Sequence, residues 1–269
     1  MASVANYRKC NPLYGYRWLA EGIKLFFSQP WPWLALVGVS LLLLLVLALL
    51  PLLGLVGIFT VFPGIVAGFL LASRDATARQ AINFRHLLAG FRIAAKPLVG
   101  LGSLVFLIFF VVLIFVLMGW HAEFQQLVAL MQSPTPDKAA VLSASAQLTQ
   151  PSLIILAAML LLTVAAWFAP ALVVFRQVEA RAALALSLRA SLSNFAPFLV
   201  FCVLLLLLNV TLSFILRLAL AAFLSLGGEQ IARSAAMLFS FPIVCGFLAI
   251  IFAAAYVSYQ DVFESKPSQ

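Results

Sequence analysis

Apolar residues fall into six long runs separated by short polar stretches. A membrane-spanning helix needs about 20 apolar residues, because the hydrocarbon core is about 30 Å thick and a helix rises about 1.5 Å per residue. The uncharged stretch 33–73 is about twice that length and is interrupted by Pro51 and Gly54, which favour a tight turn between two spans. The remaining runs are 97–119, 152–175, 197–216 and 235–258. The pattern predicts six transmembrane helices.

A short amphipathic segment followed by a proline precedes every second run. In 81–96 one face carries Phe84, Leu87, Leu88, Phe91 and Ala95, and another flank carries Arg85, Ala89, Arg92 and Lys96. In 13–28 Arg17 and Lys24 share a polar stripe, whereas 183–197 has a poorer polar side that includes Arg189. Such helices are expected to lie in the membrane interface, and the prolines mark the turn into the bilayer.

These elements predict an all-α fold in one integral membrane domain, 1–269. The bundle of six transmembrane helices and three cytoplasmic-side amphipathic helices is built from three helix-plus-hairpin repeats. Their approximate bounds are 13–73, 81–175 and 181–258. The long connector 120–150 is expected to be solvated, with a short helix around 122–131.

Composition excludes a soluble protein. Apolar residues make up 65% of the 269 residues and charged residues 9%, with a mean hydropathy of +1.16. About 25% charged residues is usual in a soluble domain. A soluble enzyme and a nucleic-acid-binding domain are therefore ruled out, despite the net charge of +8.

The distribution of the basic residues predicts the orientation. With a cytoplasmic N-terminus, only Lys138, Arg217 and Arg233 of the sixteen Lys and Arg lie on the outer side. Short cytoplasmic loops are enriched in Lys and Arg, so both termini are expected in the cytoplasm. The cations that we expect to bind anionic headgroups of the cytoplasmic leaflet are Arg17, Lys24, Arg85, Arg92, Lys96 and Arg189.

The span interiors contain no Asp, Glu, Lys or His. Charged groups inside spans usually mark catalytic or transport sites, so we expect no catalysis, no metal and no cofactor. His86 and His121 fall on opposite sides of the membrane, which argues against a shared zinc site. His86 is expected on the polar side of its amphipathic helix.

The fifth run holds a polar cluster of Asn209, Thr211, Ser213 and Arg217. The simplest interpretation is interhelical hydrogen bonding, with Arg217 extending to the outer interface. Alternatively, Arg217 pairs with Glu229 or Glu123 or holds a lipid phosphate, or Asn209, Thr211 and Ser213 line a transport path.

Small residues mark the second span. Gly64, Gly68 and Ala72 are spaced for close helix packing, either within the chain or between copies. Pro63 and Gly64 are expected to kink this span. The kink shapes packing in a plain bundle, whereas in a transporter a broken helix of this kind lines the site.

Three segments resemble a family of uncharacterised six-span inner-membrane proteins of Gram-negative bacteria: 18–27 (WLAEGIKLFF), 183–198 (ALALSLRASLSNFAPF) and 256–263 (YVSYQDVF). The hairpin repeat is similar to the membrane domain of some bacterial glycerophosphodiester phosphodiesterases. The chain lacks their catalytic domain, so the resemblance implies a bacterial inner-membrane location and no active-site residues.

The sequence therefore favours a non-catalytic, multi-pass inner-membrane protein that organises the membrane or binds lipids or a partner. The partner is either another membrane protein or a second copy of the chain. The alternative is a transporter of a small solute or a lipid.

Overall fold

The computed structural model describes residues 7–51, 53–133, 135 and 137–264. In these ranges the chain forms helices and no strand, which confirms the predicted all-α class. The helices are α1 Tyr14–Ser28, α2 Pro30–Ala48, α3 Leu53–Thr77, α4 Arg85–Gly119, α5 His121–Gln132, α6 Lys138–Gln147, α7 Thr149–Ala166, α8 Ala169–Arg176, α9 Ala180–Ser193 and α10 Phe195–Phe263.

Two of these helices contain a break. In α4 the backbone of Ala94 leaves the helical region (φ −148°), three residues before Pro97. A proline ring clashes with the carbonyl group four residues earlier, so the break lies where the sequence predicts the turn into the bilayer. In α10 the chain reverses at Gly228, whose φ of 73° favours glycine.

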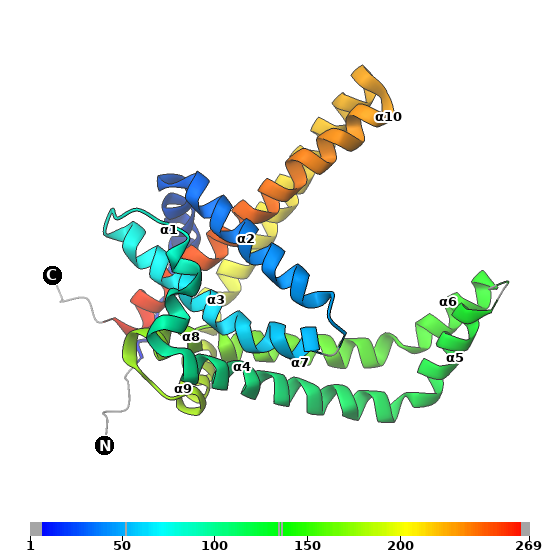
Figure 1. The fold of residues 1–269 in the computed structure, drawn as a ribbon, viewed down its shortest axis with the longest axis horizontal. Coiled ribbons are helices and arrows are strands. Elements are labelled where there is room, and N and C mark those ends of the chain that lie inside the picture. Colours follow the sequence, from blue (N-terminus) through cyan, green and yellow to red (C-terminus); the bar gives the residue numbers. More distant parts are fainter. Residues whose placement is uncertain (1–6, 52, 134, 136, 265–269) are drawn as a thin grey trace.

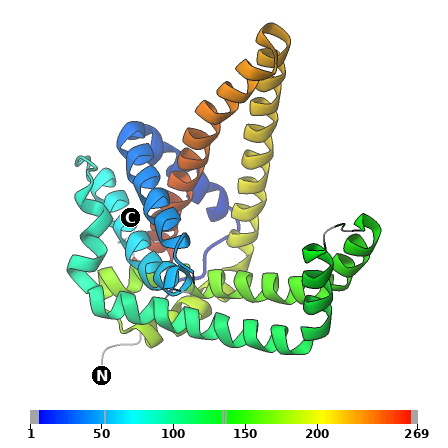
Figure 2. The ribbon, with the colours of Figure 1, turned by 45° about the vertical axis from the view of Figure 1, so that its right-hand side comes forward.

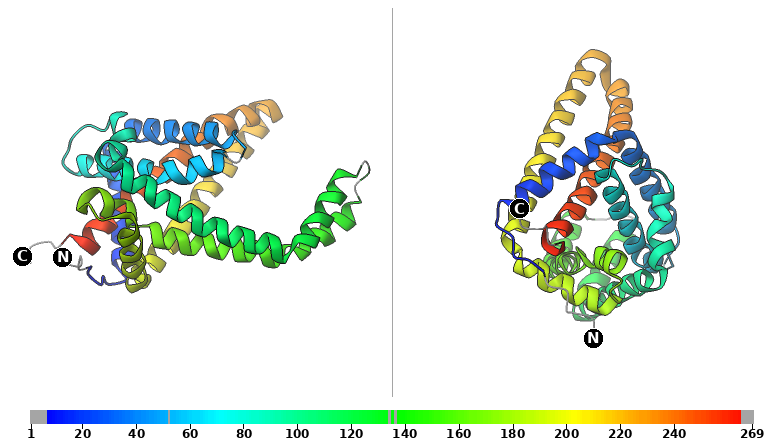
Figure 3. Two further views of the ribbon diagram at one scale, coloured as in Figure 1. Left: turned by 60° about the horizontal axis from the view of Figure 1, so that its bottom comes forward. Right: turned by 90° about the vertical axis from the view of Figure 1, so that its left-hand side faces the viewer.

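The long helices form three hairpins that project from a common base (Figures 1 and 2). The first hairpin is α2 with α3. The second is the longer part of α4 with α7, and it carries α5 and α6 at its far end. The two arms of α10 form the third, which rises away from the other helices (Figure 3). Among the residues that the structure describes, five helical segments are long and apolar enough to cross a membrane: α2, α3, α4, α7 together with α8, and α10.

At the base, the returning arm of each hairpin packs on the short helix that starts the next unit. The helix α3 packs on the first part of α4, α8 packs on α9, and the end of α10 packs on α1. The approach is close: a Cβ at Gly22 in α1 would lie 2.9 Å from the backbone oxygen of Ile250 in α10, and a Cβ at Gly90 in α4 would lie 2.6 Å from that of Gly64 in α3. The three units therefore close into a ring.

The apolar core lies in this base. Trp18, Trp33 and Phe168 are completely buried. The ring of Phe198 meets the rings of Trp18 and Trp167 edge-on at 5.3 and 5.5 Å between centroids. These contacts connect α1, the junction of α7 and α8, and the start of α10.

Some predicted elements differ in detail. The expected fourth span 152–175 is divided into α7 and α8 at Trp167 and Phe168. The backbone N–H of Phe168, which the division leaves without a helical partner, donates to the Ser187 hydroxyl of α9 at 2.9 Å. The connector 120–150 forms two helices, α5 and α6, where one was expected.

Candidate functional site

Three predicted lipid-binding cations lie on one segment of the base, on either side of the break in α4. Arg85, Arg92 and Lys96 are exposed on the first part of α4 and just after its break. Within the described ranges none of the three forms an ion pair. Phe84 and Leu88, on the same segment, are 60% and 52% exposed. Cations and apolar side chains are therefore presented together, as in helices that lie in a membrane interface.

Two other predicted cations have acidic partners. The guanidinium of Arg17 lies 3.3 Å from the carboxylate of Asp261, whose side chain is 4% exposed. In contrast, Lys24 pairs with Glu21 at 2.7 Å on the surface of α1. Arg17 therefore joins α1 to the end of α10, so its charge is not freely available to a headgroup. Arg189 is exposed on α9.

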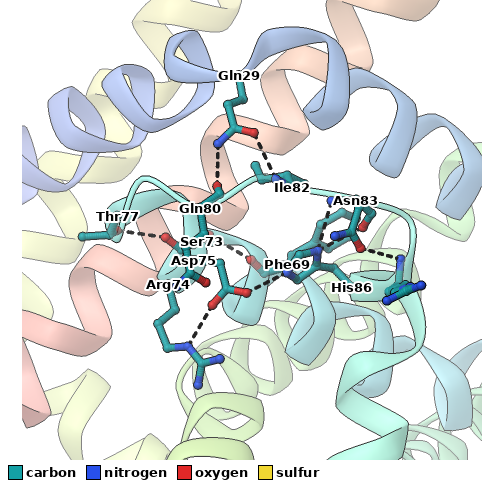
Figure 4. Close-up of polar contacts among 11 residues, drawn as sticks. Gln29, Phe69, Ser73, Arg74, Asp75, Thr77, Gln80, Ile82, Asn83 and His86 are labelled. Carbon is teal, nitrogen blue, oxygen red and sulfur yellow. Dashed lines mark hydrogen bonds and ion pairs between the residues drawn. The ribbon is translucent and has the colours of Figure 1, made fainter.

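His86 is not on the polar side of its helix, so that prediction is wrong. Its side chain is buried and its Nε2 lies 3.0 Å from Asp75 Oδ2 (Figure 4). With the proton on Nε2, the imidazole donates to Asp75, and Nδ1 accepts the backbone N–H of Asn83 at 3.2 Å. Helical periodicity within 81–96 could not reveal this, because the partner Asp75 lies at the end of α3.

Gln29, between α1 and α2, holds the loop 78–84 that joins α3 to α4. Its amide nitrogen donates to the backbone oxygen of Gln80 at 2.8 Å, and its amide oxygen accepts from the backbone N–H of Ile82 at 3.0 Å (Figure 4). Arg74 also contacts Asp75, at 3.2 Å. The segment that carries the exposed cations is therefore fixed at its start to two neighbouring helices.

The side chain of Asn194, which follows α9, forms hydrogen bonds with the N-terminal segment 8–10. The completely buried Asn194 side chain accepts the backbone N–H of Cys10 at 2.7 Å and donates to the backbone oxygen of Arg8 at 3.1 Å. The backbone N–H of Arg8 donates to Val262 at 2.8 Å. Burial raises the pKa of the Cys10 thiol. No local pattern in the sequence indicates this contact between segments that are 184 residues apart.

The glycine stripe of α3 faces the first part of α4. A Cβ at Gly64 would collide with the ring of Phe91, and a Cβ at Gly68 with the backbone oxygen of His86. Gly64 and Gly68 therefore allow close packing within the chain. The helix α3 continues through the buried Pro63 without a break, so a discontinuous helix of the transporter type is not formed here.

A cavity of about 480 Å³ lies between the three hairpins. Its walls come from α3, α4, α7, α8 and the returning arm of α10, and they include Phe59, Pro63, Leu162, Trp167 and Phe252. The indole N–H of Trp167 already donates to the Ser258 hydroxyl at 3.1 Å. The cavity is therefore suited to an apolar molecule.

A second cavity, of about 500 Å³, lies beside the break in α4. Lys96 lines it together with Glu179 and Gln177, from the turn between α8 and α9. Gln177 has a left-handed backbone (φ 57°) that ends α8. One of the exposed cations therefore borders a hollow at the base.

The residues of the predicted polar cluster line neither cavity. Asn209, Thr211, Ser213 and Arg217 are all exposed on the first arm of α10. The alternative pairing of Arg217 with Glu229 or Glu123 is not formed among the described residues, and Glu229 pairs instead with Arg233 on the same helix.

Comparison with known proteins gives one partial similarity. A probable inner membrane protein of Burkholderia thailandensis is 33% identical over 94 residues, which cover 34% of this chain and 35% of that protein. No family model matches the chain, and no solved structure matches it. The similarity spans about a third of the relative's length. It agrees with the long apolar helices in indicating an inner-membrane protein.

Proposed function

We propose that the chain is a six-span, non-catalytic protein of the bacterial inner membrane whose base binds anionic headgroups on the cytoplasmic leaflet. The two arms of α10, separated at Gly228, supply the fifth and sixth spans. Both termini then lie on the cytoplasmic side. The resemblance to the membrane domain of the phosphodiesterases remains part of this proposal and carries no enzymatic activity with it.

The observation that carries the proposal is the exposed cluster of Arg85, Arg92 and Lys96, together with Phe84 and Leu88. A cation near an anionic membrane surface contributes about 1 kcal/mol. The exposed aromatic and aliphatic groups can enter the interface beside these cations. Because the start of the segment is fixed by His86 and Gln29, it is already in position for binding.

We propose that the chain is not catalytic for two reasons. The interiors of the proposed spans contain no Asp, Glu, Lys or His, and within the described part of the chain the Asp75–His86 pair has no nucleophile available beside it. The nearby Ser73 hydroxyl donates to the backbone oxygen of Phe69 at 2.8 Å, so it is engaged within its own helix. The pair joins α3 to α4 and thereby has a structural role. Binding a membrane-protein partner at the base is compatible with the same exposed cations.

A second function, carriage of a lipid, is favoured by the central cavity. Its volume of about 480 Å³ lies within the range of about 300–1,000 Å³ typical of ligand sites. Because the walls are apolar, they favour a lipid over a polar solute.

Replacing Arg85, Arg92 and Lys96 by Gln tests the main proposal. The expected result is about a tenfold or greater loss of the anionic lipid retained per protein after purification in mild detergent. Mass spectrometry of the bound lipids measures it. The matched control carries Lys138→Gln and Arg233→Gln at the far ends of the hairpins, and it should retain lipid like the unmodified chain. Equal lipid retention in all three proteins would contradict the proposal.

A further inference from the structure

The first arm of α10 presents a polar stripe to the outside of the molecule. Asn209, Ser213 and Arg217 are spaced four residues apart, so they follow one side of the helix. Cys202, seven residues before Asn209, lies on the same side two turns earlier. All four are exposed. Thr211 lies on the opposite side.

The position of Asn209 along the helix places its amide deep in the bilayer. Asn209 is twelve residues after Pro197, or about 18 Å along the axis, in a hydrocarbon core about 30 Å thick. By the same measure Arg217 reaches the outer border. This placement rests on the six-span arrangement proposed above. There the Asn209 amide faces lipid tails, which offer it no hydrogen bond.

Several hydroxyl groups in the long helices donate a hydrogen bond to the backbone of their own helix. Ser40 donates to the oxygen of Leu36 at 2.8 Å, and Thr163 donates to that of Met159 at 2.8 Å. The side chain of Asn209 makes no hydrogen bond to any described residue. An unpaired amide in hydrocarbon is costly. We therefore expect another molecule to supply a hydrogen bond to Asn209 on this exposed side of α10.

We propose that this stripe is the contact between two copies of the chain, related by a two-fold axis along the membrane normal. A carboxamide both donates and accepts, so two Asn209 side chains on the axis satisfy each other. The small side chains of Cys202 and Ser213 allow the helices to approach. Arg217 lies at the aqueous border, where two like charges are tolerated.

The rest of the molecule supports a second copy at this face. The stripe of Gly64 and Gly68, the other candidate for self-association, is occupied by α4. The most apolar part of α10 is only 6% buried in a single copy, against 44% for α3. The third hairpin therefore has the largest side left to cover.

Oxidative cross-linking in native membranes tests the contact. The first chain has Cys202 as its only cysteine, through Cys10→Ala and Cys245→Ala. A second carries Ser213→Cys, and an off-face control carries Leu207→Cys, which is 56% exposed; in both, Cys202→Ala is added. Copper–phenanthroline should give a disulfide-linked dimer with Cys202 and with Ser213→Cys, because a disulfide requires Cα atoms within about 7 Å. The Leu207→Cys chain should stay monomeric.

Variants of Asn209 test the hydrogen bond itself. Asn209→Leu should reduce the cross-linked fraction about tenfold, and Asn209→Gln should retain it. Equal cross-linking on both faces, an unchanged dimer in Asn209→Leu, or a cross-link to a protein of another mass would overturn the proposal. The cysteine scan uses native Asn209, so it decides even if Asn209→Leu fails to fold. A chain that inserts and retains anionic lipid but stays monomeric would refute this contact and leave the proposed function standing.

Discussion

Different contacts hold the base and the third hairpin together. In the base, glycines bring α3 against α4 and α1 against α10, and buried polar side chains such as Asn194 connect segments distant in sequence. The outer part of α10 contacts mainly itself, through pairs such as the stacked rings of Phe223 and Phe239. Hydropathy identifies both α3 and α10 as candidate spans. It does not distinguish a helix packed against protein from one that faces lipid or a second copy.

The largest effect is expected at the glycine contact in the base. Gly68→Leu should destabilise the protein by about 3 kcal/mol, because the new side chain collides with the backbone of His86 and separates α3 from α4. The matched control is Gly119→Leu, at the far end of α4, where a Cβ meets no atom within 4 Å. The midpoint of thermal unfolding in detergent is measured for both variants and for the unmodified protein. Equal losses of stability would show that the base is not the tightly packed region.

A smaller difference is expected between two asparagines. Asn194→Ala removes hydrogen bonds to the backbone of Cys10 and Arg8, at a cost of about 1–3 kcal/mol for the groups left unpaired. Because Cys10 is buried and burial raises the pKa of its thiol, it should react slowly with maleimide in the unmodified protein. In Asn194→Ala its labelling rate, followed by mass spectrometry, should rise about tenfold.

Asn209→Ala is the control for that experiment, since Asn209 lies on the exposed side of the third hairpin. It should leave the Cys10 labelling rate unchanged. If both variants exposed Cys10 equally, the N-terminal segment would not depend on Asn194.

Local patterns in the sequence predict where the long helices lie and where they begin. Hydropathy located the long helices, and Pro30, Pro97 and Pro197 lie at or near the starts of the outward arms in the structure. Because a proline restricts the backbone next to it, the local sequence determines these helix boundaries. The division of α7 from α8 at Trp167 is also followed by a proline, Pro170, in the first turn of α8, but hydropathy alone does not separate the two helices.

Contacts between distant segments could not be predicted in this way. The Arg17–Asp261 and Asp75–His86 pairs join elements whose proximity depends on the ring of three units. The periodicity of 81–96 places His86 on a polar face because it contains no information on α3, which covers this residue. The amphipathic pattern of 81–96 also gave no indication that α4 would pack through Gly90, at the side of that helix facing α3.

In the proposed topology, three hairpins cross the membrane from a cytoplasmic base. Single cysteines at exposed positions test it: Arg181→Cys at the base, Ser143→Cys in α6 and Gln230→Cys near the tip of α10. A membrane-impermeant maleimide should label Ser143→Cys and Gln230→Cys in intact spheroplasts, and Arg181→Cys only in inverted membrane vesicles. Labelling of Arg181→Cys from the same side as either of the other two would contradict the account.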